Sequence, residues 1–177
     1  MKPKRKGLIL VYTGNGKGKT TAAMGAAIRA AGQGLRVLML QFMKGQPGIG
    51  IKKALARCRL PITIRQFGRQ GFVHSRACEA VDIYLAHQGL QAFRTALSSG
   101  SWDMIILDEI NMAVDFGLLQ LEDVLEVVRS KPPEVHLIFT GRNAKKPLLA
   151  IADLVTEMCE VKHHYQKGVT AQIGIEL

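Results

Sequence analysis

The segment TGNGKGKTT, residues 13–21, constrains the fold more than any other part of this sequence. It follows an apolar run, Leu8–Tyr12, and leads into Thr20–Ala31, whose alanines recur at helical spacing. A glycine-rich turn that joins a buried strand to a helix is typical of α/β proteins. Ligands of such sheets bind at the carboxyl ends of the strands, so the segment predicts a binding site where the first strand ends.

The same segment comes close to the phosphate-binding pattern G-x-x-x-x-G-K-[ST]. Gly18, Lys19 and Thr20 fit its end, whereas Thr13 replaces the first glycine and Gly14 follows one place later. Glycines can adopt positive φ and turn successive N–H groups toward an anion, and the helix start adds partial positive charge. The residues expected to bind a nucleotide's phosphates are Gly14, Asn15, Gly16, Lys17, Gly18, Lys19, Thr20 and Thr21.

Two acids, Asp108 and Glu109, follow the apolar run Met104–Leu107. Neighbouring residues of a strand face opposite ways, so the two carboxylates have different roles. One would touch a metal ion or its water shell, and the other would brace the site or orient water. Such a pair alone often only caps a helix. Together with the Thr20 hydroxyl, it predicts a site for Mg²⁺, which Mn²⁺ could also occupy.

A third feature is Arg142, in the run Thr140-Gly141-Arg142 at the end of another apolar segment. A guanidinium at that edge of a sheet can form paired hydrogen bonds with phosphate oxygens. The alternative is a surface arginine that follows a turn. We count Arg142 among the predicted ATP-binding residues.

Apolar runs of strand length recur along the chain with helical patterns between them. The further strand candidates are Val37–Phe42, Ile62–Gln66, Met104–Leu107, Val135–Thr140 and Leu154–Glu160. The further helix candidates are Ser75–Leu97, Leu121–Arg129 and Lys146–Ala152. Several strand candidates are apolar at almost every position, as in strands covered on both faces. We therefore expect an α/β fold of the P-loop NTPase-like (RecA-like) type, a three-layer sandwich with a mostly parallel central sheet.

Composition narrows the classes of function. The 177 residues predict one domain over 7–177, preceded by a basic, flexible tail over 1–6. The net charge of +10 could attract anions, but we find no nucleic-acid-binding motif and no membrane-spanning run. Three widely spaced cysteines without a CxxC pair favour a reduced, cytoplasmic setting over a zinc site or disulfides.

In order, four segments resemble the ATP:corrinoid adenosyltransferases of the CobA/BtuR type: TGNGKGKTTAAMGAAIRAAGQGLRVLMLQFMKG, ILDEI at 106–110, TGR at 140–142 and ADLVTEMCEVKHHYQKGVTAQIGIEL. The resemblance covers almost the whole chain after the tail. It implies transfer of the 5′-deoxyadenosyl group of ATP to Co(I) of a reduced corrinoid, which releases triphosphate. It also implies a corrinoid substrate, a flavodoxin-like or flavoprotein reductant and a homodimer. The alternatives are a P-loop ATPase or kinase acting at the γ-phosphate, and a nucleotide-gated binding module.

The resemblance also implies roles around the nucleotide. The glycine loop would wrap the triphosphate, while Lys19 and Arg142 would neutralise its developing charge. Thr20 and Glu109 would hold Mg²⁺, with Asp108 behind them. In this family the attacked atom is the ribose carbon C5′, so the protein needs to position that carbon and stabilise the leaving triphosphate.

For the corrinoid, the matching segment is residues 68–74. Phe72 stands where the family carries a phenylalanine that displaces the lower axial ligand of cobalt, which eases reduction to Co(I). His74 replaces a tryptophan of the best-known members, and it could fill less of the pocket or approach cobalt as a ligand. The alternatives are a core residue for Phe72 and a helix-start residue for His74. His163 and His164 lack a spaced partner in the sequence and are expected at the surface or against the corrinoid.

Overall fold

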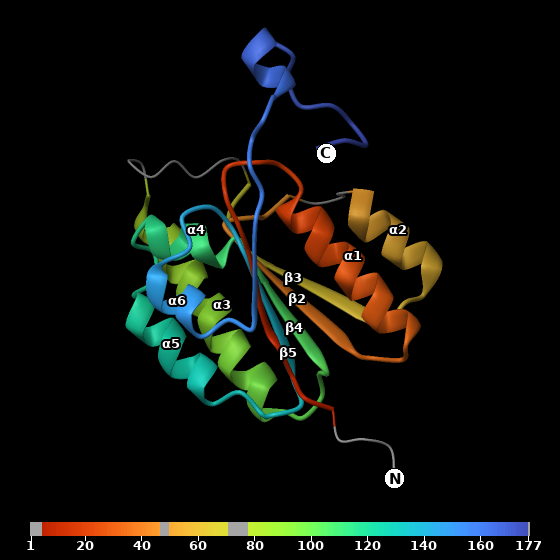
Figure 1. The fold of residues 1–177 in the computed structure, drawn as a ribbon, viewed down its shortest axis with the longest axis vertical. Coiled ribbons are helices and arrows are strands. Elements are labelled where there is room, and N and C mark those ends of the chain that lie inside the picture. Colours follow the sequence, from red (N-terminus) through yellow and green to blue (C-terminus); the bar gives the residue numbers. More distant parts are fainter. Residues whose placement is uncertain (1–4, 47–49, 71–77, 177) are drawn as a thin grey trace.

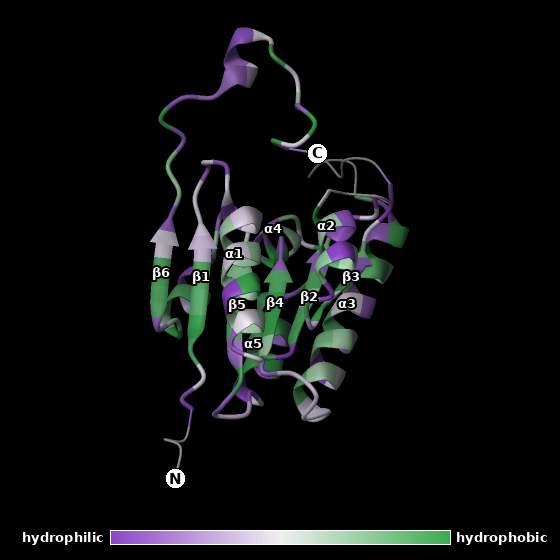
Figure 2. Cartoon of the chain, turned by 90° about the vertical axis from the view of Figure 1, so that its right-hand side faces the viewer, coloured by the Kyte–Doolittle hydropathy of each residue, from purple (hydrophilic) through white to green (hydrophobic). Residues whose placement is uncertain are grey.

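The computed structural model describes residues 5–46, 50–70 and 78–176. Within these ranges, six strands form one sheet in the order β3-β2-β4-β5-β1-β6 (Figure 2). Every neighbouring pair of strands is parallel. The strands are β1 (Ile9–Thr13), β2 (Val37–Phe42), β3 (Ile62–Phe67), β4 (Met104–Asp108), β5 (His136–Thr140) and β6 (Leu154–Glu157).

Helices cover both faces of this sheet (Figure 1). One face carries α1 (Lys19–Gly32) and α2 (Gly50–Cys58). The other carries α3 (Ala80–Ser98), α4 (Ile110–Asp115), α5 (Leu121–Arg129) and α6 (Lys146–Ala150). The predicted three-layer α/β sandwich is therefore confirmed. No helix in the described part of the chain is both long and apolar enough to span a bilayer.

The strands are apolar at successive positions because each face of the sheet has its own core. Along β2, Leu38 and Leu40 pack on the side of α3, while Val37 and Met39 pack on the side of α1. Gly89, which weakens the helix pattern of α3, has a packing reason. A Cβ there would lie 2.6 Å from the Phe42 ring, so the helix can approach β2 only because this position is glycine.

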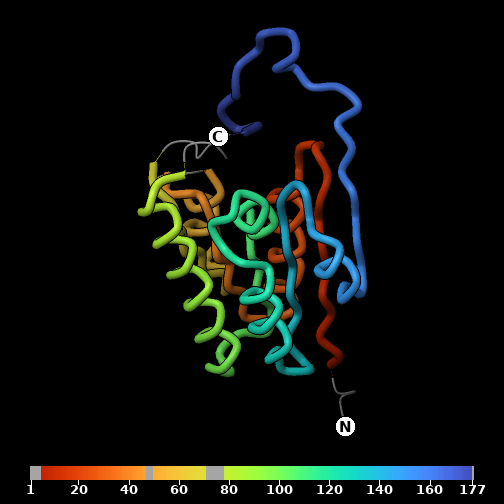
Figure 3. Tube along the Cα trace, turned by 90° about the vertical axis from the view of Figure 1, so that its left-hand side faces the viewer, coloured from red at the N-terminus to blue at the C-terminus, as the bar shows by residue number. Residues whose placement is uncertain are grey.

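The structure changes several predicted boundaries. The candidate Leu154–Glu160 forms a strand only to Glu157, and β6 is an exposed edge strand. The candidate Ser75–Leu97 is helical over Ala80–Ser98, and its first residues, 75–77, lie outside the described ranges. After β6 the chain leaves the sheet, forms a short 3₁₀ helix η1 (His164–Lys167), and folds back above the carboxyl ends of the strands (Figure 3).

Candidate nucleotide and metal site

The glycine loop between β1 and α1 uses its glycines in two ways. Gly14 and Gly18 have φ of 90° and 107°, a conformation that residues with a side chain rarely adopt. Gly16 is needed for space, because a Cβ there would lie 2.7 Å from the carbonyl oxygens of Met158 and Cys159. Gly16, unlike the other two glycines, does not use the positive φ that glycine allows, and its N–H donates to Met158 O at 2.6 Å.

Lys19 closes the loop from inside. Its Nζ donates to the carbonyl oxygens of Gly14 and Gly16 at 2.7 and 2.6 Å, and the residue is only 8% exposed. Burial lowers the pKa of Lys19, while the carboxylate of Glu109 acts in the opposite direction. The ammonium is thus held at the centre of the loop, within reach of an anion bound there.

Asp108, at the end of β4, is fully buried and saturated with hydrogen bonds. Its Oδ1 accepts from the hydroxyls of Thr20 at 2.8 Å and Thr140 at 2.7 Å. Its Oδ2 accepts from Gln41 Nε2 at 2.9 Å and Lys44 Nζ at 2.7 Å. Burial alone would raise the pKa of Asp108, but the Lys44 charge and these hydrogen bonds hold it below its ordinary value. Asp108 therefore braces Thr20 rather than facing a ligand.

Glu109 occupies a different environment, as the sequence predicted for neighbouring acids. Its backbone is left-handed, with φ of 63°, and its N–H donates to Thr140 Oγ1 at 2.9 Å. Its side chain is 25% exposed, and Oε1 lies 3.6 Å from Lys44 Nζ. Burial raises the pKa of Glu109 and nearby Asp108 adds to this, although Lys44 opposes them. In the described part of the chain this carboxylate is paired with Lys44, which leaves it able to take a further ligand.

The remaining predicted phosphate contacts lie around the loop. Arg142 is exposed, and its Nη2 donates to Asn15 O at 3.4 Å, so it stands beside the loop. Thr21 and Lys17 are also exposed, on the first turn of α1 and on the loop itself. The structure thus brings together the loop, the acid pair and the TGR arginine at the carboxyl edge of the sheet.

Three polar side chains of this site were missed by sequence reasoning: Gln41, Lys44 and Gln66. Lys44 contacts Asp108, Glu109 and Thr20. Gln66 Nε2 donates to Gln41 Oε1 at 3.1 Å, which extends the network of Asp108 to β3. The signal that could have found them is their position, since all three lie at or just after the ends of predicted strands.

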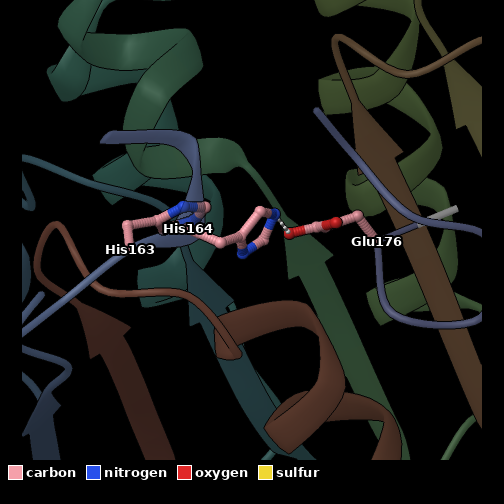
Figure 4. A group of neighbouring side chains, drawn as sticks. All are labelled: His163, His164 and Glu176. Carbon is pink, nitrogen blue, oxygen red and sulfur yellow. Dashed lines mark ion pairs between the residues drawn. The ribbon is translucent and has the colours of Figure 1, made fainter. Parts of the chain in front are cut away.

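The C-terminal segment after β6 also reaches the carboxyl ends of the strands (Figure 4). His164 Nε2 lies 3.1 Å from Glu176 Oε1, and the same carboxylate oxygen lies 3.7 Å from Nζ of Lys17 on the glycine loop. The structure therefore supplies the partner that the histidine pair lacks in the sequence. The ligand atoms of His163, His164 and Glu176 all lie within 4.8 Å of one another. However, His163 Nδ1 already accepts a hydrogen bond from Tyr165 N, and Lys17 already balances the negative charge of Glu176. We therefore infer that these three side chains hold the C-terminal segment against the glycine loop.

Phe72 and His74 fall outside the described residues, so the structure does not test their predicted corrinoid contacts. The described residues before and after this segment contact each other. Arg69 forms two hydrogen bonds of 2.9 Å with the carboxylate of Asp82, and Asp82 belongs to the capping box that begins α3. The two ends of this segment thus lie close together at the carboxyl edge.

Comparison with known proteins agrees with this geometry. The family model for ATP:corrinoid adenosyltransferase BtuR/CobO/CobP matches residues 5–177. The corrinoid adenosyltransferase of Escherichia coli K12 is 37% identical over 171 residues, which are 97% of this chain and 86% of that protein. That of Pseudomonas aeruginosa is 34% identical over 97% of this chain and 84% of its own length. The corrinoid adenosyltransferase CobA of Salmonella typhimurium is 36% identical over 97% and 86%. The chain therefore belongs to the ATP:corrinoid adenosyltransferase family BtuR/CobO/CobP.

Proposed function

We propose that this protein transfers the 5′-deoxyadenosyl group of ATP to Co(I) of a reduced corrinoid and releases triphosphate. The observation that carries the proposal is the contact between the glycine loop and the acid pair at the carboxyl ends of the strands, in a chain of this family. The nucleophile comes with the corrinoid, so the protein supplies positioning and charge rather than acid–base chemistry.

The loop residues would stabilise the leaving triphosphate. Lys19 now donates to loop carbonyls, and the same ammonium can donate to phosphate oxygens that enter between them. The start of α1 presents unpaired N–H groups to the same place. Arg142 beside Asn15 would add a second full charge. Negative charge builds on the triphosphate as the C5′–O bond breaks, so these groups act on the leaving group.

The acid pair suits Mg²⁺, a hard cation that takes oxygen ligands. The hydroxyl of Thr20 and the partly exposed carboxylate of Glu109 would hold it, and Mn²⁺ could take its place. Asp108 would orient Thr20 through their 2.8 Å hydrogen bond. When bound, the ion neutralises phosphate charge.

The corrinoid would lie beside the residues between Arg69 and Asp82. There Phe72 would displace the lower axial ligand of cobalt and His74 would contact the corrinoid, as the family resemblance implies. A flavodoxin-like or flavoprotein electron donor, a homodimer and a cytoplasmic location belong to the same proposal. None of the three cysteines, Cys58, Cys78 and Cys159, forms a disulfide in the described structure, which supports the last of these.

The test is anaerobic incubation with Mg²⁺, ATP and chemically reduced cob(I)alamin, followed by the cobalamin spectrum and identification of the phosphate product. We expect light-sensitive adenosylcobalamin together with an equimolar amount of triphosphate. Orthophosphate with an unchanged corrinoid would instead indicate an ATPase. A phosphorylated acceptor would indicate a kinase, and ATP left unconsumed would indicate a binding module.

A further inference from the structure

The ammonium of Lys44 lies among Thr20 and Glu109, which would hold the divalent cation, and Asp108, which orients Thr20. Its Nζ is 2.7 Å from Asp108 Oδ2, 3.1 Å from Thr20 Oγ1 and 3.6 Å from Glu109 Oε1. The hydroxyl of Thr20 accepts from Lys44 while it donates to Asp108. A positive charge is therefore already present at the proposed metal site.

Magnesium binds oxygen ligands at about 2.0–2.1 Å. An ion held by Thr20 and Glu109 would then lie within a few ångströms of the Lys44 ammonium, in a partly buried place where like charges repel strongly. The ammonium and the ion therefore compete for one group of oxygens.

The backbone around Lys44 is fixed, which leaves the side chain as the part that can move. Met43, just before it, adopts a left-handed conformation with φ of 57° and donates its N–H to Phe67 O at 3.0 Å. A Cβ on Gly45 would collide with the carbonyl of Gly68, and one on Gly68 would collide with Lys44 N. These close contacts hold the turn against β3. The flexible four-carbon stem of the lysine can still swing its charge out of the site.

We infer that Lys44 holds the place of the divalent cation in the nucleotide-free protein, so that the metal enters only together with ATP. The inference rests on the metal site of the proposed function. ATP brings negative phosphates, to which the displaced ammonium can turn while the cation takes its oxygens. Lys44 is in this sense a positioning residue: it balances the acid pair before the nucleotide arrives and gives up that place afterwards.

The test measures Mn²⁺ binding to nucleotide-free protein by electron paramagnetic resonance, without corrinoid or turnover. Lys44→Met should bind Mn²⁺ more tightly than the unchanged protein by about tenfold or more, since a like charge near the ion is removed. The matched control is Lys52→Met, which removes the same charge from a lysine that donates to Gln66 Oε1 at 2.7 Å. It should leave Mn²⁺ binding unchanged, and Lys44→Arg should keep it weak.

Adding ATP should raise the Mn²⁺ affinity of the unchanged protein and have a smaller effect on Lys44→Met. Equal Mn²⁺ binding by Lys44→Met and Lys52→Met without ATP would overturn the inference. If Lys44→Met does not fold, as judged by circular dichroism, Lys44→Gln carries the same comparison, because its amide can still donate to Asp108. The phosphate-product assay reports separately on the reaction, so the two proposals can fail independently.

Discussion

Replacing the buried Asp108 by asparagine tests whether its hydrogen bonds hold the site together. The change keeps the shape of the side chain but turns one acceptor atom into a donor. Placed at Oδ2, the new NH₂ group would face the donors of Gln41 and Lys44. Placed at Oδ1, it would face the hydroxyls of Thr20 and Thr140, whose protons would lose their acceptor. The first orientation breaks two of the four hydrogen bonds, the second forces two of them to reverse, and in both the carboxylate charge is lost.

Hydrogen bonds to a charged group contribute about 1.5–3 kcal/mol each. Two of them give 3–6 kcal/mol, and we take the lower end, about 3 kcal/mol, because the Lys44 side chain is one-third exposed and water screens its charge. A loss of this size is a large share of the total stability of a domain, which is roughly 5–15 kcal/mol. Asp108→Asn should therefore unfold at clearly lower denaturant concentration.

The assay is urea unfolding followed by circular dichroism, with the midpoint and the slope fitted together. The matched control is Glu109→Gln, the same chemical change one residue along. Glu109 is 25% exposed and its contact with Lys44 is 3.6 Å, so its loss should cost less than about 1 kcal/mol. Equal losses of unfolding free energy in the two variants would refute the claim that Asp108 is the structural acid.

Three further predictions concern the loop, the opposite edge of the sheet and the corrinoid. Gly16→Ala should weaken ATP binding roughly tenfold in calorimetry, because the loop must shift to relieve overpacking of about 1–3 kcal/mol against Met158. Gly25→Ala should not, since no atom beyond its own stretch of helix lies within 4 Å of the added Cβ. Hydrogen bonds from Arg36 and Arg5 hold the pKa of Asp103 well below its ordinary value, and stability from a depressed carboxyl pKa is lost as pH falls. As the pH drops below about 4, the free energy of unfolding of Asp103→Asn should therefore fall less than that of the unchanged protein. The same pH profile for both proteins would contradict this. Phe72→Ala should leave ATP affinity intact and slow adenosylation of Co(II) substrate under a weak reductant, and an unchanged rate would rule out its role.

Much of the fold follows from local sequence because buried parallel strands are continuous apolar runs. Val37–Phe42 and Leu121–Arg129 have the bounds expected from the sequence. The helices α2 and α4 were missed for physical reasons. The helix α2 has nine residues and packs against the core through the half-buried Ile51 and Leu55, so its periodic pattern is short, and α4 has only six residues.

The site was predictable where its residues follow strand ends in the sequence, as the glycine loop and the acid pair do. The partners of Asp108 were not, since they depend on which strands become neighbours. Gln41 contacts Asp108 because β2 and β4 pair with these two residues in register. Gly16 likewise needs its space because a segment far along the chain, at Met158, passes beside it. Such contacts follow from topology rather than from any local pattern.

The two described ends of the chain lie at opposite ends of the strands (Figure 1). This determines where the protein can be immobilised or labelled. Arg5 is bonded to Asp103 and to the carbonyl of Glu134, at the edge away from the glycine loop. Glu176 lies beside Lys17 on the loop itself. A surface linker or fluorescent fusion attached ahead of Arg5 leaves the nucleotide edge open, whereas one attached after Glu176 crowds it.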